Sequence, residues 1–484
     1  MITAAITRRA PLWFLAVASS LAPLLAVEPL PPMESVTLLR PVTLPAPTTD
    51  FAPLPLQAAP FAYADWHGVR YAVRSGRRVT GTRPAFPGAV LLIGRMEGDR
   101  WRDLAGVDEA PESDLGRVDL KVRETGLHLT YQVRGPEGRV VARAVTFDPS
   151  AAPAAPEGQW SRLPDFPQAP GVAGLIAGVH QGVLLAAGGA NFPDRMPWEG
   201  GVKQYYDRIY ALRPGDTAWI EAGRLPEPRA YSAVVSVPEG LLVLGGENGP
   251  TLLSDSLLLQ WTGTTVAIRP GPALPAPITS AVAVVSDGRV YLAGGYAPGD
   301  YRVSRKEFWS LDLKALDAGW RPLPTWPGAP RAMAILAAWN HSIYLLSGLD
   351  VSPGPDGKAQ TTYLVDAYRY DPDGTWTRLP DLPWSAIAAP SPAPVDPATG
   401  RIFVLGGVDG RQVGKMPREG RVPEDILVFD ARAGTWRLWP QPWPHSVVTT
   451  PTFAQGHRWH FISGEIKAGV RTTAAWTWEI GSEP

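Results

Sequence analysis

The 484-residue chain contains no cysteine. Disulfide bonds, cysteine nucleophiles and metal sites with thiolate ligands are therefore excluded. An excess of positive charge is also missing, because 45 lysines and arginines face 46 aspartates and glutamates, for a formal net charge of −1. Proteins that bind nucleic acid usually present a basic surface to the phosphates, so we expect no nucleic-acid partner.

Sequence motifs of several common catalytic sites are missing as well. The chain has no glycine-rich phosphate loop ahead of a helix, no Gly-x-Ser-x-Gly and no His-Glu-x-x-His. His457 and His460 lie three residues apart in a predicted strand, where their side chains point to opposite faces. We therefore expect neither a metal site nor an organic cofactor.

The first residues have the pattern of a cleaved export signal over 1–26. Arg8 and Arg9 precede an apolar run over residues 11–27. A retained membrane anchor is the alternative, but two serines and a proline interrupt the run, and it is shorter than the ~20 residues that span a bilayer. We expect an exported protein of the bacterial periplasm or cell surface, without a membrane span after signal cleavage.

Composition divides the rest of the chain into four segments. Glycine and proline, at 49 and 53 residues, predict many turns and few long helices. Residues 27–60 read as a Pro-rich linker with a possible short strand at 35–39, and residues 61–148 as a small β-domain of unknown role. An Ala/Pro-rich linker over 149–158 then leads into residues 159–484.

Residues 159–484 contain an internal repeat. Six apolar strands end in Gly-Gly or Ser-Gly, and their second glycines recur at intervals of 49 to 59 residues, a period typical of propeller arrays. Most repeats continue with an aromatic or apolar strand, a tryptophan and a Leu-Pro pair. This pattern resembles the kelch repeat, which implies an all-β fold: a six-bladed kelch β-propeller preceded by the small β-rich domain. The six strands are 183–189, 241–246, 289–295, 342–348, 401–407 and 458–464.

The two ends of the repeat region complement each other. Residues 160–164 form the end of a repeat that has no beginning, whereas the sixth repeat stops after the strand at 474–480. If the orphan segment completes the last blade, the ring closes and no sheet edge stays open. We therefore predict backbone pairing between residues around Trp160 and residues 476–479.

Polar residues recur at two positions of the repeat that should meet at one mouth of the ring. Asn191, Glu247 and Glu465 follow glycine pairs, while Arg229, Tyr231 and Arg331 precede the strands that lead to them. Convergence of these side chains predicts a polar pocket. For the two arginines, a structural ion pair within the propeller is an equal alternative.

Two segments go beyond what a structural repeat requires, namely residues 188–206 and 463–472. The second reads Gly464-Glu465-Ile466-Lys467-Ala468-Gly469-Val470-Arg471-Thr472. With these residues the chain resembles the N-acetylneuraminate epimerase family, the sialic acid mutarotases. Its motif has proline where this chain has Ala468. Segments similar to the family's last two blades come first here, so the resemblance is to a cyclically permuted member.

The resemblance implies that Glu465 is the proton acceptor and that Arg471 belongs to the site. We expect an isomerase that interconverts the anomers of N-acetylneuraminate or a related sugar acid by general acid–base ring opening and closure, with Arg471 holding the substrate carboxylate. A carbohydrate-binding propeller without turnover, a protein-interaction scaffold, and a plain Glu465–Arg471 ion pair remain alternatives. The expected substrate-binding residues are Asn191, Lys203, Tyr206, Arg229, Tyr231, Glu247 and Arg331.

Overall fold

The computed structural model describes residues 158–480, apart from 299–302, 355–356, 411–412, 414–421 and 440–442, and most of eight strands between residues 36 and 147. The predicted export signal and most of both predicted linkers lie outside the described residues. Within the described part of the chain, no helix is long and apolar enough to cross a membrane.

The N-terminal strands form two four-stranded sheets. One has the order β1 (Val36–Leu38), β8 (Val140–Phe147), β7 (Gly126–Arg134) and β6 (Asp114–Arg123). The other has the order β2 (Ala62–Trp66), β3 (Val69–Ser75), β4 (Leu91–Glu97) and β5 (Arg100–Val107).

The short strand expected at 35–39 is present as β1. It pairs in parallel with β8, with Val36 opposite Ala142, so this sheet begins inside the segment that the sequence assigns to a linker.

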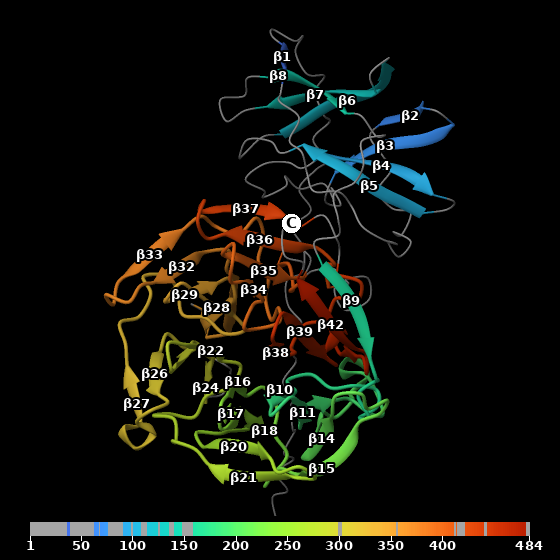
Figure 1. The fold of residues 1–484 in the computed structure, drawn as a ribbon. Helices are drawn as coiled ribbons and strands as arrows, with labels where there is room; N and C mark the ends of the chain where they lie inside the picture. Colours follow the sequence, from blue (N-terminus) through green and yellow to red (C-terminus); the bar gives the residue numbers. More distant parts are fainter. Residues whose placement is uncertain are drawn as a thin grey trace, which may run out of the picture. The chain divides into compact units, whose positions relative to one another are not determined.

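Residues 158–480 form a β-propeller of six four-stranded antiparallel sheets (Figure 1). Blade 1 contains β10 (Ile176–His180), β11 (Val183–Ala187), β14 (Arg208–Leu212) and β15 (Ile220–Arg224). Blade 2 contains β16 (Ala233–Val237), β17 (Gly240–Leu244), β20 (Ser256–Trp261) and β21 (Val266–Pro270). Blade 3 contains β22 (Val282–Ser286), β23 (Arg289–Ala293), β26 (Phe308–Asp312) and β27 (Trp320–Pro322).

The remaining blades repeat this order. Blade 4 contains β28 (Ile335–Trp339), β29 (Ser342–Leu346), β32 (Ala367–Tyr370) and β33 (Trp376–Leu379). Blade 5 contains β34 (Val395–Asp396), β35 (Arg401–Leu405), β36 (Ile426–Asp430) and β37 (Thr435–Leu438). Blade 6 contains β38 (Thr452–Gln455), β39 (Arg458–Ile462), β42 (Ala475–Ile480) and β9 (Gly158–Leu163).

Small elements occupy the connections. Two short 3₁₀-helices are described, η1 (Pro197–Glu199) and η2 (Leu316–Ala318). In the described residues, a two-stranded ribbon follows the Gly-Gly or Ser-Gly pair (called the glycine pair below) of every blade but the fifth. These ribbons are β12–β13 (Ala190–Asn191, Gln204–Tyr205), β18–β19 (Glu247–Asn248, Thr251–Leu252), β24–β25 (Tyr296–Ala297, Val303–Ser304), β30–β31 (Leu349–Pro353, Ala359–Tyr363) and β40–β41 (Glu465–Lys467, Val470–Arg471).

The hydrophobic core lies between the faces of neighbouring blades. All five residues of β11, β17 and β29 are buried, because each of these strands has a blade on both sides, and this explains their unbroken apolar sequences. The core shared by blades 1 and 2, for example, combines Leu185 and Ile209 with Leu241 and Leu259.

The repeated tryptophan forms a second interblade contact, in three of the four described cases with the proline of a Leu-Pro pair. Each described tryptophan of this kind lies at or beside the fourth strand of a blade, and its indole N–H donates to a proline carbonyl after the fourth strand of the preceding blade. The distances are 2.7 to 3.2 Å for Trp219–Pro164, Trp320–Pro272, Trp376–Pro324 and Trp436–Pro380.

The predicted ring closure is confirmed. Strand β9 pairs antiparallel with β42, and Trp160 lies opposite Trp478. Their rings stack with centroids 5.2 Å apart, and Trp160 also stacks on Trp443 at 6.2 Å. The first strand of the propeller thus supplies the outer edge of the last blade, which leaves the ring without a gap.

A closed ring of six backbone hydrogen bonds surrounds the propeller axis. In the segment that leads into the first strand of each blade, one residue donates its N–H to the carbonyl of the equivalent residue in the preceding blade, at 2.7 to 3.1 Å. Each of the six has a φ between +51° and +65°, a backbone conformation that is uncommon for residues other than glycine. The members of this axial ring are Gly174, Tyr231, Ser280, Met333, Ala388 and Thr449.

Truncation of the closing tryptophan should destabilise the propeller. Trp478 is fully buried between Trp160 and Phe403, so Trp478→Ala should lower the free energy of unfolding by about 3–5 kcal/mol. Trp198 is 44% exposed, and Trp198→Ala is a control with the same truncation. Urea denaturation measures both; equal losses would contradict a special role for the closure.

His460 should make the propeller less stable in acid. Its ring stacks on Phe453 and its Nδ1 lies 3.0 Å from the Thr477 hydroxyl, and burial lowers its pKa to about 4. In the unfolded chain the histidine has a pKa of about 6.5. Between about pH 4 and pH 6.5 the unfolded chain therefore binds a proton at His460 that the folded chain does not bind. The free energy of unfolding should therefore fall by about 3 kcal/mol as the pH drops from about 6.5 to about 4.

The matched variant for this prediction is His460→Phe, which keeps a ring against Phe453 but cannot titrate. Its unfolding free energy should depend less steeply on pH over the same interval, whatever its absolute stability. Denaturation curves recorded across the interval give both slopes. Parallel slopes for the two proteins would show that His460 does not carry the effect.

Candidate functional site

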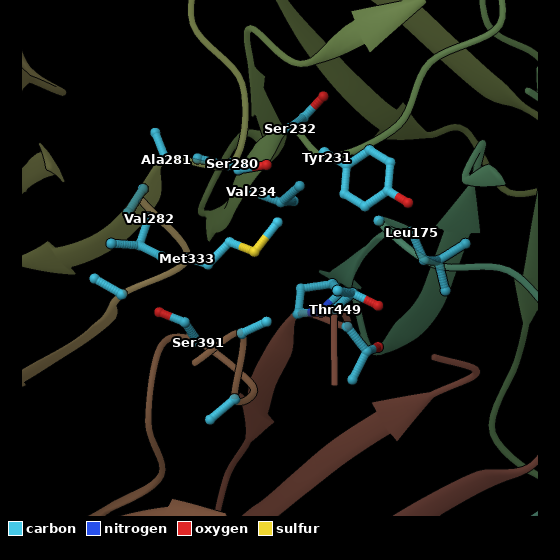
Figure 2. A pocket seen from close by; sticks show the side chains of 18 residues that line it. Leu175, Tyr231, Ser232, Val234, Ser280, Ala281, Val282, Met333, Ser391 and Thr449 are labelled. Carbon is cyan, nitrogen blue, oxygen red and sulfur yellow. The ribbon is translucent and has the colours of Figure 1, made fainter. Parts of the chain in front are cut away.

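The two repeat positions singled out in the sequence do meet at one end of the propeller. In each blade an isolated bridge joins the residue after the glycine pair to the residue before the axial ring, as in Ala230–Glu247 and Val448–Glu465. The second glycine allows this approach: Gly246 has a φ of +103°, and an added Cβ would lie 2.8 Å from the Ala230 carbonyl oxygen. Figure 2 shows the axial cavity of about 90 Å³ that the ring residues line.

Glu465 and Arg471 face each other across the β40–β41 ribbon of blade 6. Glu465 Oε2 lies 3.3 Å from Arg471 Nη2, and Glu465 Oε1 accepts a hydrogen bond of 2.7 Å from the Gly469 N–H. At Gly469, with a φ of +78°, an added Cβ would come within 2.9 Å of Trp198. The glycine therefore serves both the tight turn and the close packing of the blade 1 loop on this turn.

Arg471 is a buried cation with unused hydrogen-bonding capacity. Its side chain is 4% exposed, and Nε and Nη1 have no hydrogen-bond partner among the described residues. Burial alone would lower the pKa of Arg471, but Glu465, Tyr231 and Tyr205 outweigh it and raise the pKa. Buried donors without partners are costly, whereas a guanidinium binds a carboxylate through two parallel hydrogen bonds. The arrangement therefore suits an incoming anion.

Blades 1 and 2 add a lysine and two tyrosines to this corner of the mouth. Lys203 Nζ lies 4.9 Å from the centroid of the Tyr231 ring and 3.5 Å from its hydroxyl. The Tyr205 hydroxyl donates to Glu247 Oε1 at 2.7 Å, and Thr279 donates to the other carboxylate oxygen at 3.1 Å. Glu247 is fully buried, and the Tyr205 hydroxyl links its carboxylate to the mouth.

Tyr205 was missed by the sequence analysis, which selected its neighbour Tyr206. Adjacent residues of an extended segment point to opposite sides, so only one of the two tyrosines can face Glu247, but a two-residue strand is too short a pattern to indicate which. In the structure Tyr205 belongs to β13, whereas Tyr206 follows it.

Asn191 and Tyr206 have their polar groups occupied within the protein. Asn191 is fully buried; its Oδ1 accepts from the Tyr206 hydroxyl and its Nδ2 donates to the Gly171 carbonyl, both at 2.8 Å. Burial raises the pKa of the Tyr206 phenol. We assign this pair to the support of the blade 1 loop rather than to direct contact with a ligand.

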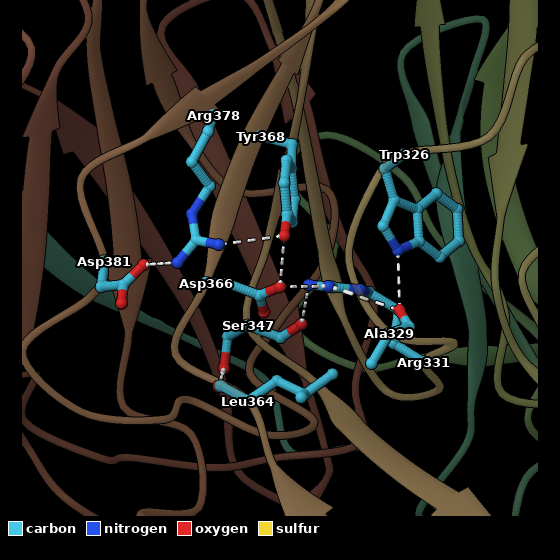
Figure 3. Close-up of polar contacts among 9 residues, drawn as sticks. All are labelled: Trp326, Ala329, Arg331, Ser347, Leu364, Asp366, Tyr368, Arg378 and Asp381. Carbon is cyan, nitrogen blue, oxygen red and sulfur yellow. Dashed lines mark hydrogen bonds and ion pairs between the residues drawn. The ribbon is translucent and has the colours of Figure 1, made fainter.

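Arg229 and Arg331 occupy equivalent places in blades 2 and 4 and are both bound to an aspartate. Arg229 Nη2 lies 2.7 Å from Asp255, and Arg331 Nη2 lies 2.8 Å from Asp366 (Figure 3). Arg331 Nη1 also donates to the Ser347 carbonyl. With side-chain exposures of 1% and 0%, neither guanidinium reaches the mouth. The structural ion pair is therefore the alternative that the geometry supports, in place of substrate binding.

These two kinds of buried arginine should respond differently to truncation. Arg331→Met leaves Asp366 without its cation and should lower the free energy of unfolding by about 3–5 kcal/mol. Arg471→Met removes a guanidinium with two unpaired nitrogens, so its loss should be smaller. Urea denaturation of the two variants tests this, and a larger loss for Arg471→Met would contradict the distinction.

Comparison with known proteins relates this propeller to one family. The family profile described as N-acetylneuraminate epimerase matches residues 154–268 and 271–416. The turn that carries Glu465 and Arg471 lies outside the matched residues, and the cyclic order of the blades stays a prediction. A solved structure described as "Structure of YjhT" gives a TM-score of 0.48 at 14% identity, covering 65% of this chain and 96% of that one.

Three curated relatives, all named N-acetylneuraminate epimerase, illustrate the extent of the similarity. The protein of Brucella suis is 34% identical over 200 residues, which is 37% of this chain and 48% of the relative. That of Haemophilus influenzae is 27% identical over 228 residues (42% and 57%), and that of Yersinia pestis is 33% identical over 127 residues (23% and 32%). The chain thus spans between about a third and just over half of the length of these relatives. Because the family profile matches more than half of the chain, from the closing strand β9 into blade 5, the chain belongs to the N-acetylneuraminate epimerase family.

Proposed function

We propose that the protein is an isomerase that interconverts the anomers of N-acetylneuraminate or a closely related sugar acid. The observation that carries this proposal is the buried Arg471, whose Nε and Nη1 lack partners among the described residues, beside the carboxylate of Glu465. Family membership supports the reaction class, and the export signal expected over residues 1–26 is consistent with a sugar encountered outside the cytoplasm.

Arg471 is suited to bind the carboxylate of such a sugar. N-acetylneuraminate carries this group on its anomeric carbon, so a bidentate contact with the guanidinium would fix the reacting carbon next to Glu465. The Lys203 ammonium adds a second positive charge to the same corner of the mouth. Phe192, whose ring centroid lies 5.1 Å from Arg471 Cζ, holds the guanidinium from the blade 1 side.

Glu465 is suited to accept the proton of the anomeric hydroxyl. Ring opening of a cyclic hemiketal requires that this hydroxyl lose a proton while the ring oxygen gains one, and general acid–base catalysis is sufficient for both transfers. The Gly469 N–H and Arg471 fix the Glu465 carboxylate, and its side chain is 15% exposed, so a bound sugar can reach it.

Sugar binding without turnover is the second candidate. Trp198 is 44% exposed and packs beside Gly469, so it offers an aromatic face for a sugar ring at the edge of the mouth. A lectin would use Arg471 and Trp198 in the same way but would not need Glu465 as a base. Rate measurements with the wild-type protein separate the two functions.

Glu465→Gln should abolish most of the rate acceleration. The amide keeps the shape and a hydrogen bond from Gly469 but cannot accept the proton, and loss of one positioned base typically costs ~10²–10⁴-fold. Proton NMR of freshly released α-N-acetylneuraminate follows the approach to the anomeric equilibrium. Glu479→Gln, at the exposed Glu479–Arg458 ion pair, is the matched control and should keep the wild-type rate.

The outcomes distinguish the candidates. Binding of the sugar by the wild type with only the spontaneous anomerisation rate would favour the lectin. An unchanged rate in Glu465→Gln, with a wild type that accelerates the reaction, would show that another group is the base.

In the proposed enzyme, Arg471→Lys should chiefly raise KM, because an ammonium cannot form the planar two-point contact.

A further inference from the structure

The proposed reaction requires a second group that gives a proton to the ring oxygen. Glu465 starts as the acceptor, and Arg471 holds the carboxylate, so neither can fill this role. Three side chains that the structure describes close to Arg471 or to one another carry a suitable proton: Lys203, Tyr205 and Tyr231. Their positions and contacts separate them.

We propose that Tyr231 is the catalytic acid, which protonates the ring oxygen as the sugar opens and removes that proton as it closes. This assignment rests on the isomerase function proposed above and deepens it. The Tyr205 hydroxyl already donates to the buried Glu247 at 2.7 Å, and Lys203 directs its ammonium toward the Tyr231 hydroxyl at 3.5 Å. Both phenols lie near the two cations, but Lys203 Nζ is closer to the Tyr231 ring, at 4.9 Å, than to the Tyr205 ring, at 5.8 Å. Since the Tyr205 proton is already directed to Glu247, Tyr231 is the better placed acid.

The internal repeat shows that the backbone does not require a tyrosine here. The axial ring imposes the same positive φ on all six blades, and the other five positions hold glycine, serine, methionine, alanine and threonine. A bulky residue at positive φ is strained, and such strain is often retained where a side chain has a functional task. Among these equivalent positions, Tyr231 alone carries an acid that can exchange its proton with a sugar oxygen.

The neighbouring ring position makes room for the Tyr231 side chain. Gly174 of blade 1 lies next to it, and a Cβ added there would fall 2.7 Å from Cγ and Cδ1 of the tyrosine ring. Figure 2 shows the ring extending from blade 2 toward Leu175 of blade 1. The phenol therefore leans over Gly174 toward blade 1, the side from which Lys203 approaches its hydroxyl.

The charges around Tyr231 favour proton donation. Lys203 Nζ lies within 3.5 Å of the hydroxyl, and Tyr231 is close enough to Arg471 to be among the groups that raise its pKa. Negative charge that develops on the phenol oxygen during proton transfer is stabilised by these two fixed cations. Lys203 acts in this scheme as a positioning residue.

The protons of the reaction balance without another reactant. The anomeric hydroxyl gives its proton to Glu465, the bond from the anomeric carbon to the ring oxygen breaks, and the ring oxygen takes the bond's electron pair and the Tyr231 proton. The carbonyl group of the open chain then rotates relative to the chain hydroxyl, so that its other face is presented to that hydroxyl. On closure the tyrosinate removes the proton from the chain hydroxyl, whose oxygen attacks the other face, and the carbonyl oxygen regains the proton from Glu465.

Tyr231→Phe tests the assignment in the full-length protein with N-acetylneuraminate as the probe. The variant keeps the axial ring and the aromatic ring, so it should unfold like the wild type, bind with nearly the same KM and lose ~10²–10⁴-fold in kcat. Tyr344→Phe, which removes a buried phenol of blade 4, is the control and should keep the wild-type kcat.

A second variant keeps the test informative if Tyr231→Phe does not fold. Lys203→Met leaves the axial ring untouched and should lower kcat, since it removes a cation beside the phenol oxygen. A wild-type kcat in either variant, or a raised KM with unchanged kcat in Tyr231→Phe, would overturn the assignment while leaving the isomerase in place. A wild-type protein that does not accelerate anomerisation would refute the isomerase itself, and Tyr231 as its acid would fall with it.

Discussion

The axial ring of backbone hydrogen bonds fixes the geometry on which the candidate site depends. Each blade gives one N–H and one carbonyl to the ring, so a shift of one blade would lengthen bonds to both neighbours. The bridges beside the ring then bring the segment after each glycine pair to the same mouth. Side chains from blades 6, 1 and 2, separated by up to about 270 residues in sequence, consequently meet at one corner.

The same scaffold uses buried arginines for two purposes. Arg229 and Arg331 are bound by aspartates from their own blades, and these contacts hold the loops before the first strands. Arg471 has only part of its guanidinium satisfied by the described residues, although it is almost as deeply buried. Burial alone therefore does not identify a functional arginine; the hydrogen-bond partners that it lacks are the more informative property.

Much of the fold could be predicted because the six copies of the repeat can be compared with one another. The missing half of the last repeat predicted the pairing of Trp160 with Trp478, and glycine pairs located the mouth. The roles of Arg229 and Arg331 could not be decided in advance, because Asp255 and Asp366 lie 26 and 35 residues away and no local pattern links them. Tyr205 was confused with Tyr206 since a two-residue strand is too short to show alternation.

Ring closure by β9 also has a consequence for the order of events during synthesis. The first strand of the propeller emerges about 300 residues before its partner β42, so it has no sheet to join while blades 1 to 5 form. Closing so long a loop is slow and entropically costly compared with forming the local hairpins. The last blade, which carries Glu465 and Arg471, therefore cannot be completed until β42 has been made, and a product truncated before blade 6 would lack both of these residues.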